Sequence, residues 1–187
     1  GAAATRTGGA ASGVGAVKEG QTRRLTPRQP TADHRSLYHS HFTRPEVERW
    51  LRPSPLPPFT AGAVDELVEG DHAHWADHGF GPWLAIERET GAFVRRGGLH
   101  WTTVEDTAMV ELAWSIEPSL HNRGYATEMA TAAVEWAREL EIEELVALVL
   151  PANVPSRRVP EKVGCEPNGE VEHAGLPHLL FRLAPAA

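Results

Sequence analysis

Two apolar runs of strand length, joined by a loop and an amphipathic run of helix length, most constrain how this chain can fold. The first apolar run extends from Val110 to Ile116 and the second from Leu145 to Leu150, with the helix-like run Thr127 to Leu140 between them. Small apolar residues such as Ala130 and Ala133 share one stripe of the helix-like run, which lets a helix pack tightly on a sheet. The order strand, helix, strand therefore predicts an α/β fold.

The loop before the helix-like run, His121-Asn122-Arg123-Gly124-Tyr125-Ala126, is predicted to hold phosphate. The first amide groups of a helix have no partner within the helix, and the helix dipole favours negative charge at that end. Gly124 has no side chain, so the backbone can come close to a ligand. Placed after a strand and before a helix, this loop points to a cofactor that contains a pyrophosphate group.

A second motif follows the second apolar run. From Asn153 to Gly164 the residues have the pattern N-x-x-S-x-x-V-x-E-K-x-G. Together with Val110-Glu111-Leu112 and the segment Arg123 to Glu128, this motif resembles the GCN5-related N-acetyltransferase (GNAT) superfamily. Within the superfamily, the chain is most similar to the ribosomal-protein N-acetyltransferase-like branch. The resemblance spans most of residues 22 to 183.

The resemblance implies the GNAT fold, a mixed and mostly antiparallel central sheet of about six or seven strands flanked by helices. It implies that the two apolar runs form parallel strands that splay around acetyl-CoA, the acetyl donor, and that no metal ion is needed. By position, Trp114 and Ile116 would give backbone contacts to the pantetheine arm, and Asn153 would anchor the other end of the cofactor. The contacts to pyrophosphate would come from His121, Asn122, Arg123, Gly124, Tyr125 and Ala126.

Transfer of an acetyl group from a thioester to an amine needs an unprotonated amine and a way to protonate the departing thiolate. For the base, the resemblance favours Glu111, with a water molecule as a possible relay. His100 on the preceding strand is the second candidate, because an imidazole titrates near neutral pH. Many superfamily members place a thiolate-protonating tyrosine seven residues after the asparagine, but here that position is Pro160. Ser156 is therefore the proposed proton donor.

These residues predict an acetyl-CoA-dependent N-acetyltransferase in which a primary amine attacks the thioester directly in a ternary complex. The amine could belong to a protein N-terminus, an amino acid, a polyamine or an antibiotic. Pro160, together with Arg95 at a position where the branch usually has glycine, keeps open an acyl-CoA-binding regulatory module without catalysis. A generic nucleotide-phosphate-binding protein is a weaker alternative, because the chain has no G-x-x-x-x-G-K-[ST] loop.

The rest of the chain is predicted to complete the sheet and to cover it. Strands are expected at 22–28, 83–88, 93–104, 109–116, near Val171 and at 176–183, with a hairpin turn at 89–91. Helices are expected from a cap at Thr31 to about Phe42, at 44–51 and at 61–78, and the proline-rich segment 52–58 is expected to form a loop.

Length and composition bound the class of protein. The 187 residues and the 41% hydrophobic content fit a single domain over residues 21–187, preceded at 1–20 by a disordered tail or a remnant of expression. The net charge of −7 argues against a broad nucleic-acid-binding surface. No run reaches the roughly 20 apolar residues of a membrane span. The single Cys165 excludes an internal disulfide and agrees with a cytoplasmic location.

Three histidines, His72, His74 and His78, lie close together in the sequence. Without a clear third ligand at a fixed spacing, they are interpreted as surface residues rather than as a zinc site, so no metal is predicted. The partner is expected to be a small-molecule or peptide amine, and the resemblance suggests a homodimer.

Overall fold

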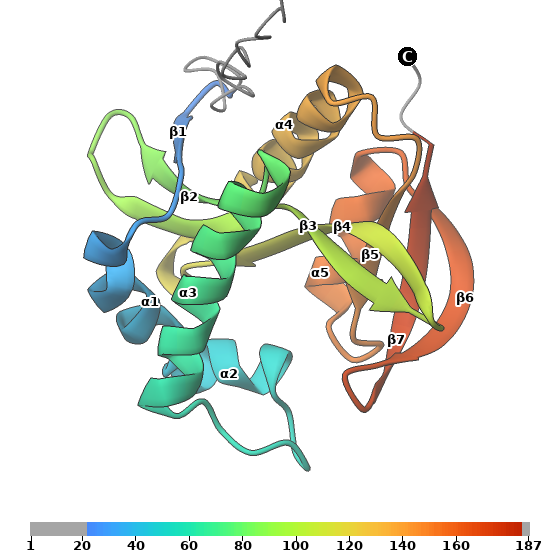
Figure 1. The fold of residues 1–187 in the computed structure, drawn as a ribbon, viewed down its shortest axis with the longest axis horizontal. Coiled ribbons are helices and arrows are strands. Elements are labelled where there is room, and N and C mark those ends of the chain that lie inside the picture. Colours follow the sequence, from blue (N-terminus) through green and yellow to red (C-terminus); the bar gives the residue numbers. More distant parts are fainter. Residues whose placement is uncertain (1–21, 185–187) are drawn as a thin grey trace, which may run out of the picture.

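Seven strands form one sheet in the order β1-β2-β3-β4-β5-β7-β6, with helices on both faces (Figure 1). The computed structural model describes residues 22–184, so the tail predicted at 1–20 lies outside the described residues. The strands are β1 (Leu25–Arg28), β2 (Pro82–Glu87), β3 (Phe93–Val104), β4 (Thr107–Ile116), β5 (Leu145–Val149), β6 (Glu166–His173) and β7 (Leu176–Leu183). The α-helices are α1 (Arg35–Phe42), α2 (Pro45–Leu51), α3 (Ala61–His78), α4 (Tyr125–Glu139) and α5 (Val154–Lys162). The predicted α/β fold with six or seven strands is confirmed.

The sheet opens between β4 and β5. These two strands are the parallel pair, and they pair only at Val110 with Leu145 and at Glu111 with Val146. Beyond these positions β4 stays paired with β3 as far as Ile116, while β5 stays paired with β7 as far as Val149. All other neighbouring strands are antiparallel. The mostly antiparallel sheet with one splayed parallel pair therefore matches the prediction.

Helix α4 packs on the face of the sheet that carries the larger core. Gly97 of β3 permits this close approach, because a β carbon there would lie 2.4 Å from the terminal methyl group of Met129 on the helix. The indole of Trp136 on α4 stacks on Trp75 of α3, with ring centroids 5.3 Å apart, and contacts Trp83 of β2 at 5.2 Å. These aromatic contacts join the end of α3 to α4 near the start of β2.

Several element boundaries differ from the prediction; β1, for example, begins at Leu25 and not at residue 22. Two of the differences have local reasons. Helix α4 begins at Tyr125, two residues before the predicted start, because Gly124 adopts a left-handed conformation with a φ of 78° and forms the N-cap. The segment from the Thr31 cap begins as a short 3-10 turn, Ala32–His34, before α1. None of the helices in residues 22–184 combines the length and the apolar character that crossing a membrane requires.

A buried ionic network fixes the N-terminal helices to the other face of the sheet. Asp71 of α3 is only 4% exposed, and its two carboxylate oxygens accept hydrogen bonds from Nε and Nη2 of Arg96 on β3, each at 2.6 Å. The hydroxyl of Tyr38 on α1 donates to the same carboxylate at 2.6 Å. Burial raises the pKa of the Tyr38 hydroxyl well above its usual value, so the hydroxyl keeps its proton. The network therefore joins α1, α3 and β3 through satisfied polar groups.

Replacing Asp71 by alanine is expected to lower the free energy of unfolding by about 3 kcal/mol, because Arg96, whose side chain is only 14% exposed, would keep its charge without its carboxylate partner. The exposed pair of Arg182 and Glu144, with Nη1 and Oε1 2.9 Å apart, supplies a matched control. Glu144→Ala should change the same free energy by less than about 1 kcal/mol. Urea unfolding measures both values, and equal effects would contradict a structural role for the buried network.

Candidate active site

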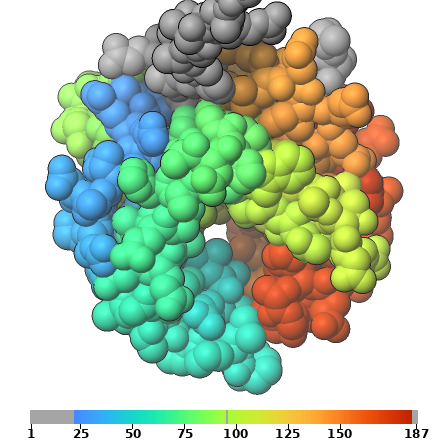
Figure 2. Space-filling view, viewed as in Figure 1, coloured from blue at the N-terminus to red at the C-terminus, as the bar shows by residue number. Residues whose placement is uncertain are grey.

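A cleft with a volume of 520 Å³ occupies the space where β4 and β5 separate. The end of β4, the end of β5, the loop before α4, and helices α2 and α5 form its walls, together with the turn between β6 and β7. Figure 2 shows an opening in this face between the N-terminal helices and the β3–β4 and β6–β7 hairpins. Of the residues proposed for the site from the sequence, the cleft is lined by Glu111, Trp114, Ile116, His121, Asn122, Gly124, Tyr125, Ala126, Asn153 and Ser156, and Arg123 lies outside it.

The backbone of β4 forms an open edge along the cleft. Within the described chain, the residues that follow Glu111 on β4 pair with β3 on one side and have no strand partner on the other. Backbone N–H and C=O groups need partners when a ligand displaces water from them, so such an edge can bind an extended ligand through strand-like hydrogen bonds. At the end of the edge, Nε2 of His121 lies 3.1 Å from the carbonyl oxygen of Ile116 and donates to it.

The loop before α4 has the conformation of an anion cradle. Asn122 and Gly124 both have positive φ, at 61° and 78°. The first hydrogen bond of the helix runs from the amide of Glu128 to the carbonyl of Gly124, at 3.0 Å. The amides of the three residues between them, from Tyr125 onward, therefore have no acceptor within the helix and stand at its positive end. This geometry supports the predicted phosphate site.

Arg24, which was not predicted from the sequence, stabilises the loop before α4 and the first turn of the helix. Its Nε donates to Oε2 of Glu128 at 2.7 Å, its backbone amide donates to Oε1 of Glu128 at 2.6 Å, and its Nη1 donates to the carbonyl of Arg123 at 3.0 Å. The guanidinium also lies 4.2 Å from the centre of the Tyr125 ring, and the Tyr125 hydroxyl donates to Glu87. The side chain of Tyr125 is thus part of the scaffold, and only its backbone amide is available to a ligand.

The two candidate bases are neighbours across β3 and β4. Nε2 of His100 lies 3.2 Å from Oε2 of Glu111, and the two residues are directly opposite in the strand register. Burial alone would raise the pKa of Glu111, but the electrostatic effect and hydrogen bond of His100, with the electrostatic effects of His173 and Arg96, outweigh it and hold this pKa below its usual value. Glu111 is therefore ionised at neutral pH, and it can attract a cationic amine. Nδ1 of His100 is buried and has no hydrogen-bond partner among residues 22–184.

Ser156 of α5 faces β4 across the cleft. The indole Nε1 of Trp114 donates to the Ser156 hydroxyl oxygen at 2.9 Å, so the hydroxyl hydrogen remains available to a second acceptor. Asn153 caps α5, with its side-chain oxygen 3.4 Å from the amide nitrogen of Ser156.

Two residues depart from the pattern of the family that the sequence resembles. Pro160 lies in the second turn of α5 and has no amide hydrogen, so the carbonyl of Ser156 receives no helix hydrogen bond from this position. Arg95 pairs with Ile116 and Ala85 through its backbone, and its side chain lies outside the described part of the chain.

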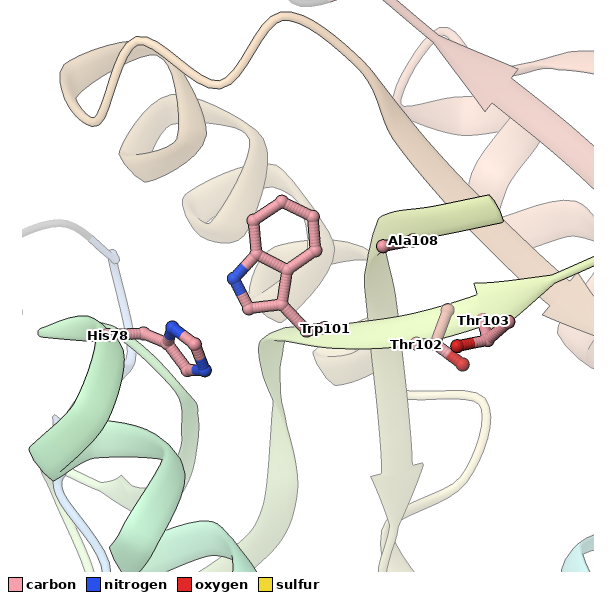
Figure 3. Close-up of a pocket in the computed structure, with 5 residues that line it drawn as sticks. All are labelled: His78, Trp101, Thr102, Thr103 and Ala108. Carbon is pink, nitrogen blue, oxygen red and sulfur yellow. The ribbon is translucent and has the colours of Figure 1, made fainter. Parts of the chain in front are cut away.

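A second and shallower pocket of 320 Å³ lies away from the cleft, lined by His78 at the end of α3 and by Trp101, Thr102, Thr103 and Ala108 (Figure 3). Its neighbour His74 is held by the backbone. Nδ1 of His74 bonds to the carbonyl oxygen of Phe80 at 2.8 Å, and Nε2 accepts the amide hydrogen of Trp101 at 2.8 Å. In residues 22–184, no group of three or more His, Cys, Asp or Glu side chains is arranged to hold a metal ion.

Comparison with known proteins gives a consistent result. The family model described as an acetyltransferase (GNAT) domain matches residues 24–166. The uncharacterized N-acetyltransferase YnaD of Bacillus subtilis is 37% identical over 60 residues, which make up 32% of this chain and only 35% of YnaD. The uncharacterized protein YkkB of Bacillus subtilis is 28% identical over 138 residues, covering 71% of this chain and 75% of YkkB.

Solved structures of acetyltransferases share the fold. An acetyltransferase from Agrobacterium tumefaciens is 25% identical with a TM-score of 0.73, covering 87% of this chain and 91% of that one. AAC(6')-Ib in complex with ribostamycin and coenzyme A is 18% identical with a TM-score of 0.68, covering 87% and 94%. The ribosomal-protein-S5-alanine acetyltransferase from Vibrio fischeri is 13% identical with a TM-score of 0.66, covering 87% and 94%.

The bonds of His74 predict a pH dependence of stability. Burial lowers the pKa of His74 in the folded protein, and protonation would remove the lone pair that accepts the Trp101 amide hydrogen. A group with a depressed folded pKa contributes stability above its unfolded pKa of about 6.5, and this contribution is lost as the pH falls through the folded value. Between about pH 7 and pH 5, the unfolding free energy should therefore fall more steeply for the wild type than for His74→Gln.

Urea unfolding at a series of pH values measures this difference. His72→Gln, an exposed position on the same helix, is the control and should follow the wild type. Parallel pH profiles for the wild type and His74→Gln would show that burial and the hydrogen bond from the Trp101 amide do not favour the neutral form of His74.

Proposed function

The chain belongs to the GNAT acetyltransferase family, and on that premise we propose that it transfers the acetyl group of acetyl-CoA to a primary amine by direct attack in a ternary complex. The observation that carries the proposal is the short pairing of β4 with β5, limited to two residue pairs. It leaves an open strand edge that leads to the unpaired amides at the start of α4. A thioester carried on an extended arm with a pyrophosphate group fits both features.

Acetyl-CoA would be held mainly by backbone groups. Trp114 and Ile116 on the open edge would bond to the pantetheine arm, the loop from His121 to Ala126 would bind the pyrophosphate, and Asn153 would contact the other end. The carboxylate of Glu128, in the first turn of α4, would repel a phosphate group if it were unpaired. Arg24 neutralises it through two short hydrogen bonds, which keeps the cradle suitable for an anion.

Glu111 is the proposed group that receives the amine and assists its deprotonation, directly or through a water molecule. Its position opposite His100 fixes the carboxylate, and its ionised state attracts an ammonium group. Because its pKa lies below the usual value, Glu111 passes a proton on more readily than it retains one. Ser156 is the proposed donor to the departing thiolate, since its hydroxyl accepts a hydrogen bond from Trp114 and keeps its own hydrogen.

The acceptor is proposed as a small-molecule or peptide amine. Two fold neighbours support this range, because one was solved with ribostamycin and another is named for a ribosomal protein. A noncatalytic acyl-CoA-binding module is the alternative, and Pro160 at the tyrosine position favours it. A cytoplasmic location and a homodimer remain predictions.

The test measures release of free thiol from acetyl-CoA with a panel of aminoglycosides, polyamines, amino acids and N-terminal peptides, with coenzyme A affinity measured by calorimetry. Glu111→Gln should lower kcat about 100-fold, and Ser156→Ala should lower it about 10-fold, because each removes one proton transfer. Both variants should keep the coenzyme A affinity of the wild type, since the proposed cofactor contacts are made elsewhere. Glu144→Gln, on the exposed ion pair outside the cleft, should change neither quantity.

The outcomes separate the two candidate functions. Turnover that falls in Glu111→Gln while binding persists supports the enzyme and its assigned base. Tight binding of coenzyme A without turnover on any amine would favour the regulatory module. Failure of the wild type to bind coenzyme A would contradict both.

A further inference from the structure

The hairpin of β6 and β7 brings two further histidines into the cleft. His173, the last residue of β6, and His178 on β7 both line it, and their rings meet edge to face with centroids 5.6 Å apart. Neither was singled out from the sequence, because the hairpin is far from the motifs that carry the resemblance. Both rings are half-buried.

Strand register places His178 on the same face of the sheet as the proposed base. Glu111 is opposite Val146 on β5, and Leu148, two residues further on, is opposite Leu180 on β7. Side chains two residues apart on a strand point to the same face, so Glu111, Leu180 and His178 share one face. His100, opposite Glu111 on β3, lies on that face as well.

One hydrogen bond fixes the tautomer of His178. Its Nδ1 lies 3.0 Å from the carbonyl oxygen of Leu176, and a carbonyl can only accept, so Nδ1 carries the hydrogen. In the neutral ring Nε2 then has a free lone pair. Burial lowers the pKa of His178, and the electrostatic effect of His173 lowers it further, against the opposing effects of the Leu176 carbonyl and of Glu111. The ring is therefore neutral at pH 7, and it can accept a proton.

The other imidazole near Glu111 is less suited to accept the proton. His100 directs Nε2 at Glu111, and its Nδ1 is buried. Its role is consequently to position the carboxylate, while His178 offers a ring nitrogen of defined protonation within the cleft.

We propose that Nε2 of His178 is the proton acceptor of the reaction, taking the proton that leaves the ammonium group of the substrate by way of Glu111 and water. This inference rests on the proposed acetyl transfer. The ammonium nitrogen gives one proton to Nε2, and the freed lone pair forms the C–N bond as the C–S bond breaks. The hydroxyl of Ser156 protonates the thiolate sulfur and recovers its hydrogen from the second proton lost by the nitrogen. The proton on His178 then passes to solvent, so one proton is released per turnover.

Other charged and titratable side chains line the same cleft. They are His173 on β6, Glu111 on β4, Arg96 and His100 on β3, Glu46 and Arg49 on α2, His121 before α4 and Tyr125 at its start, and Lys162 on α5. Of these, His173 is the ring in direct contact with His178. It therefore gives a way to change the proton affinity of His178 without removing the ring.

The test is the pH dependence of kcat/KM from pH 5 to 9, with an acceptor whose amine pKa is well above 7. The wild type should show an acid limb with an apparent pKa below about 6.5. His178→Gln should lose about 100-fold in kcat/KM at pH 7, and the loss should shrink as the pH approaches the amine pKa, because the free amine then forms without a base. Coenzyme A affinity should be unchanged.

Two matched variants accompany this measurement. His173→Gln should retain the acid limb but move it to higher pH, because the substitution removes the electrostatic effect of His173 that lowers the His178 pKa. His72→Gln, exposed on α3 and outside the cleft, should behave as the wild type. An active wild type whose pH profile is unchanged in His178→Gln would overturn the inference and leave the proposed function intact.

The tautomer provides a readout that does not depend on turnover. Nitrogen chemical shifts of the histidine rings, assigned by the loss of one signal in His178→Gln, should show hydrogen on Nδ1 and a lone pair on Nε2 at pH 7. Hydrogen on Nε2 instead would overturn the inference whether or not an acceptor is found. A wild type without turnover on any amine would count against the proposed acetyl transfer, while the tautomer result would still decide the state of His178.

Discussion

The short contact between β4 and β5 determines what this molecule can present to a ligand. Two residue pairs join the two halves of the sheet, and beyond them each strand follows its own antiparallel partner, β3 or β7. The strands can therefore separate while each keeps a full set of hydrogen bonds on its outer side. The separation exposes one edge of β4 and directs it toward the N-terminus of α4, where unpaired amides continue the polar surface.

Because side chains alternate between the two faces of a strand, the sheet carries apolar core residues on one face and the candidate catalytic residues on the other. Residues of β4 that point to one face, such as Leu112, join the core beneath α4. Glu111 points to the opposite face, where His100 and His178 also lie. On that face the bidentate bond of Arg96 to Asp71 holds α3 in place beside the cleft. A single sheet thus separates an apolar supporting layer from a polar cleft.

Local sequence patterns predicted most helices and strands, but they could not predict contacts between residues that are far apart in the sequence. Helix 61–78 and strand 93–104 have the predicted bounds, because a Thr60 cap, a terminal Gly79 and a hairpin turn mark their ends in the sequence itself. The residues proposed for the cleft, except Arg123, do line it. The bond of Arg24 to Glu128 joins residues 104 positions apart, and the pairing of His100 with Glu111 depends on strand register. Neither leaves a periodic signal in the sequence.

The proposed function requires the open edge of β4 and the start of α4 to bind coenzyme A through their backbone. Amide hydrogen exchange, followed residue by residue with and without coenzyme A, measures this binding mode. The amides of residues 112–116 and 121–127 should become protected when coenzyme A binds, while those in the α1 and α3 layer should exchange at their original rates. Binding of coenzyme A that protects neither segment would show that the cofactor is held elsewhere.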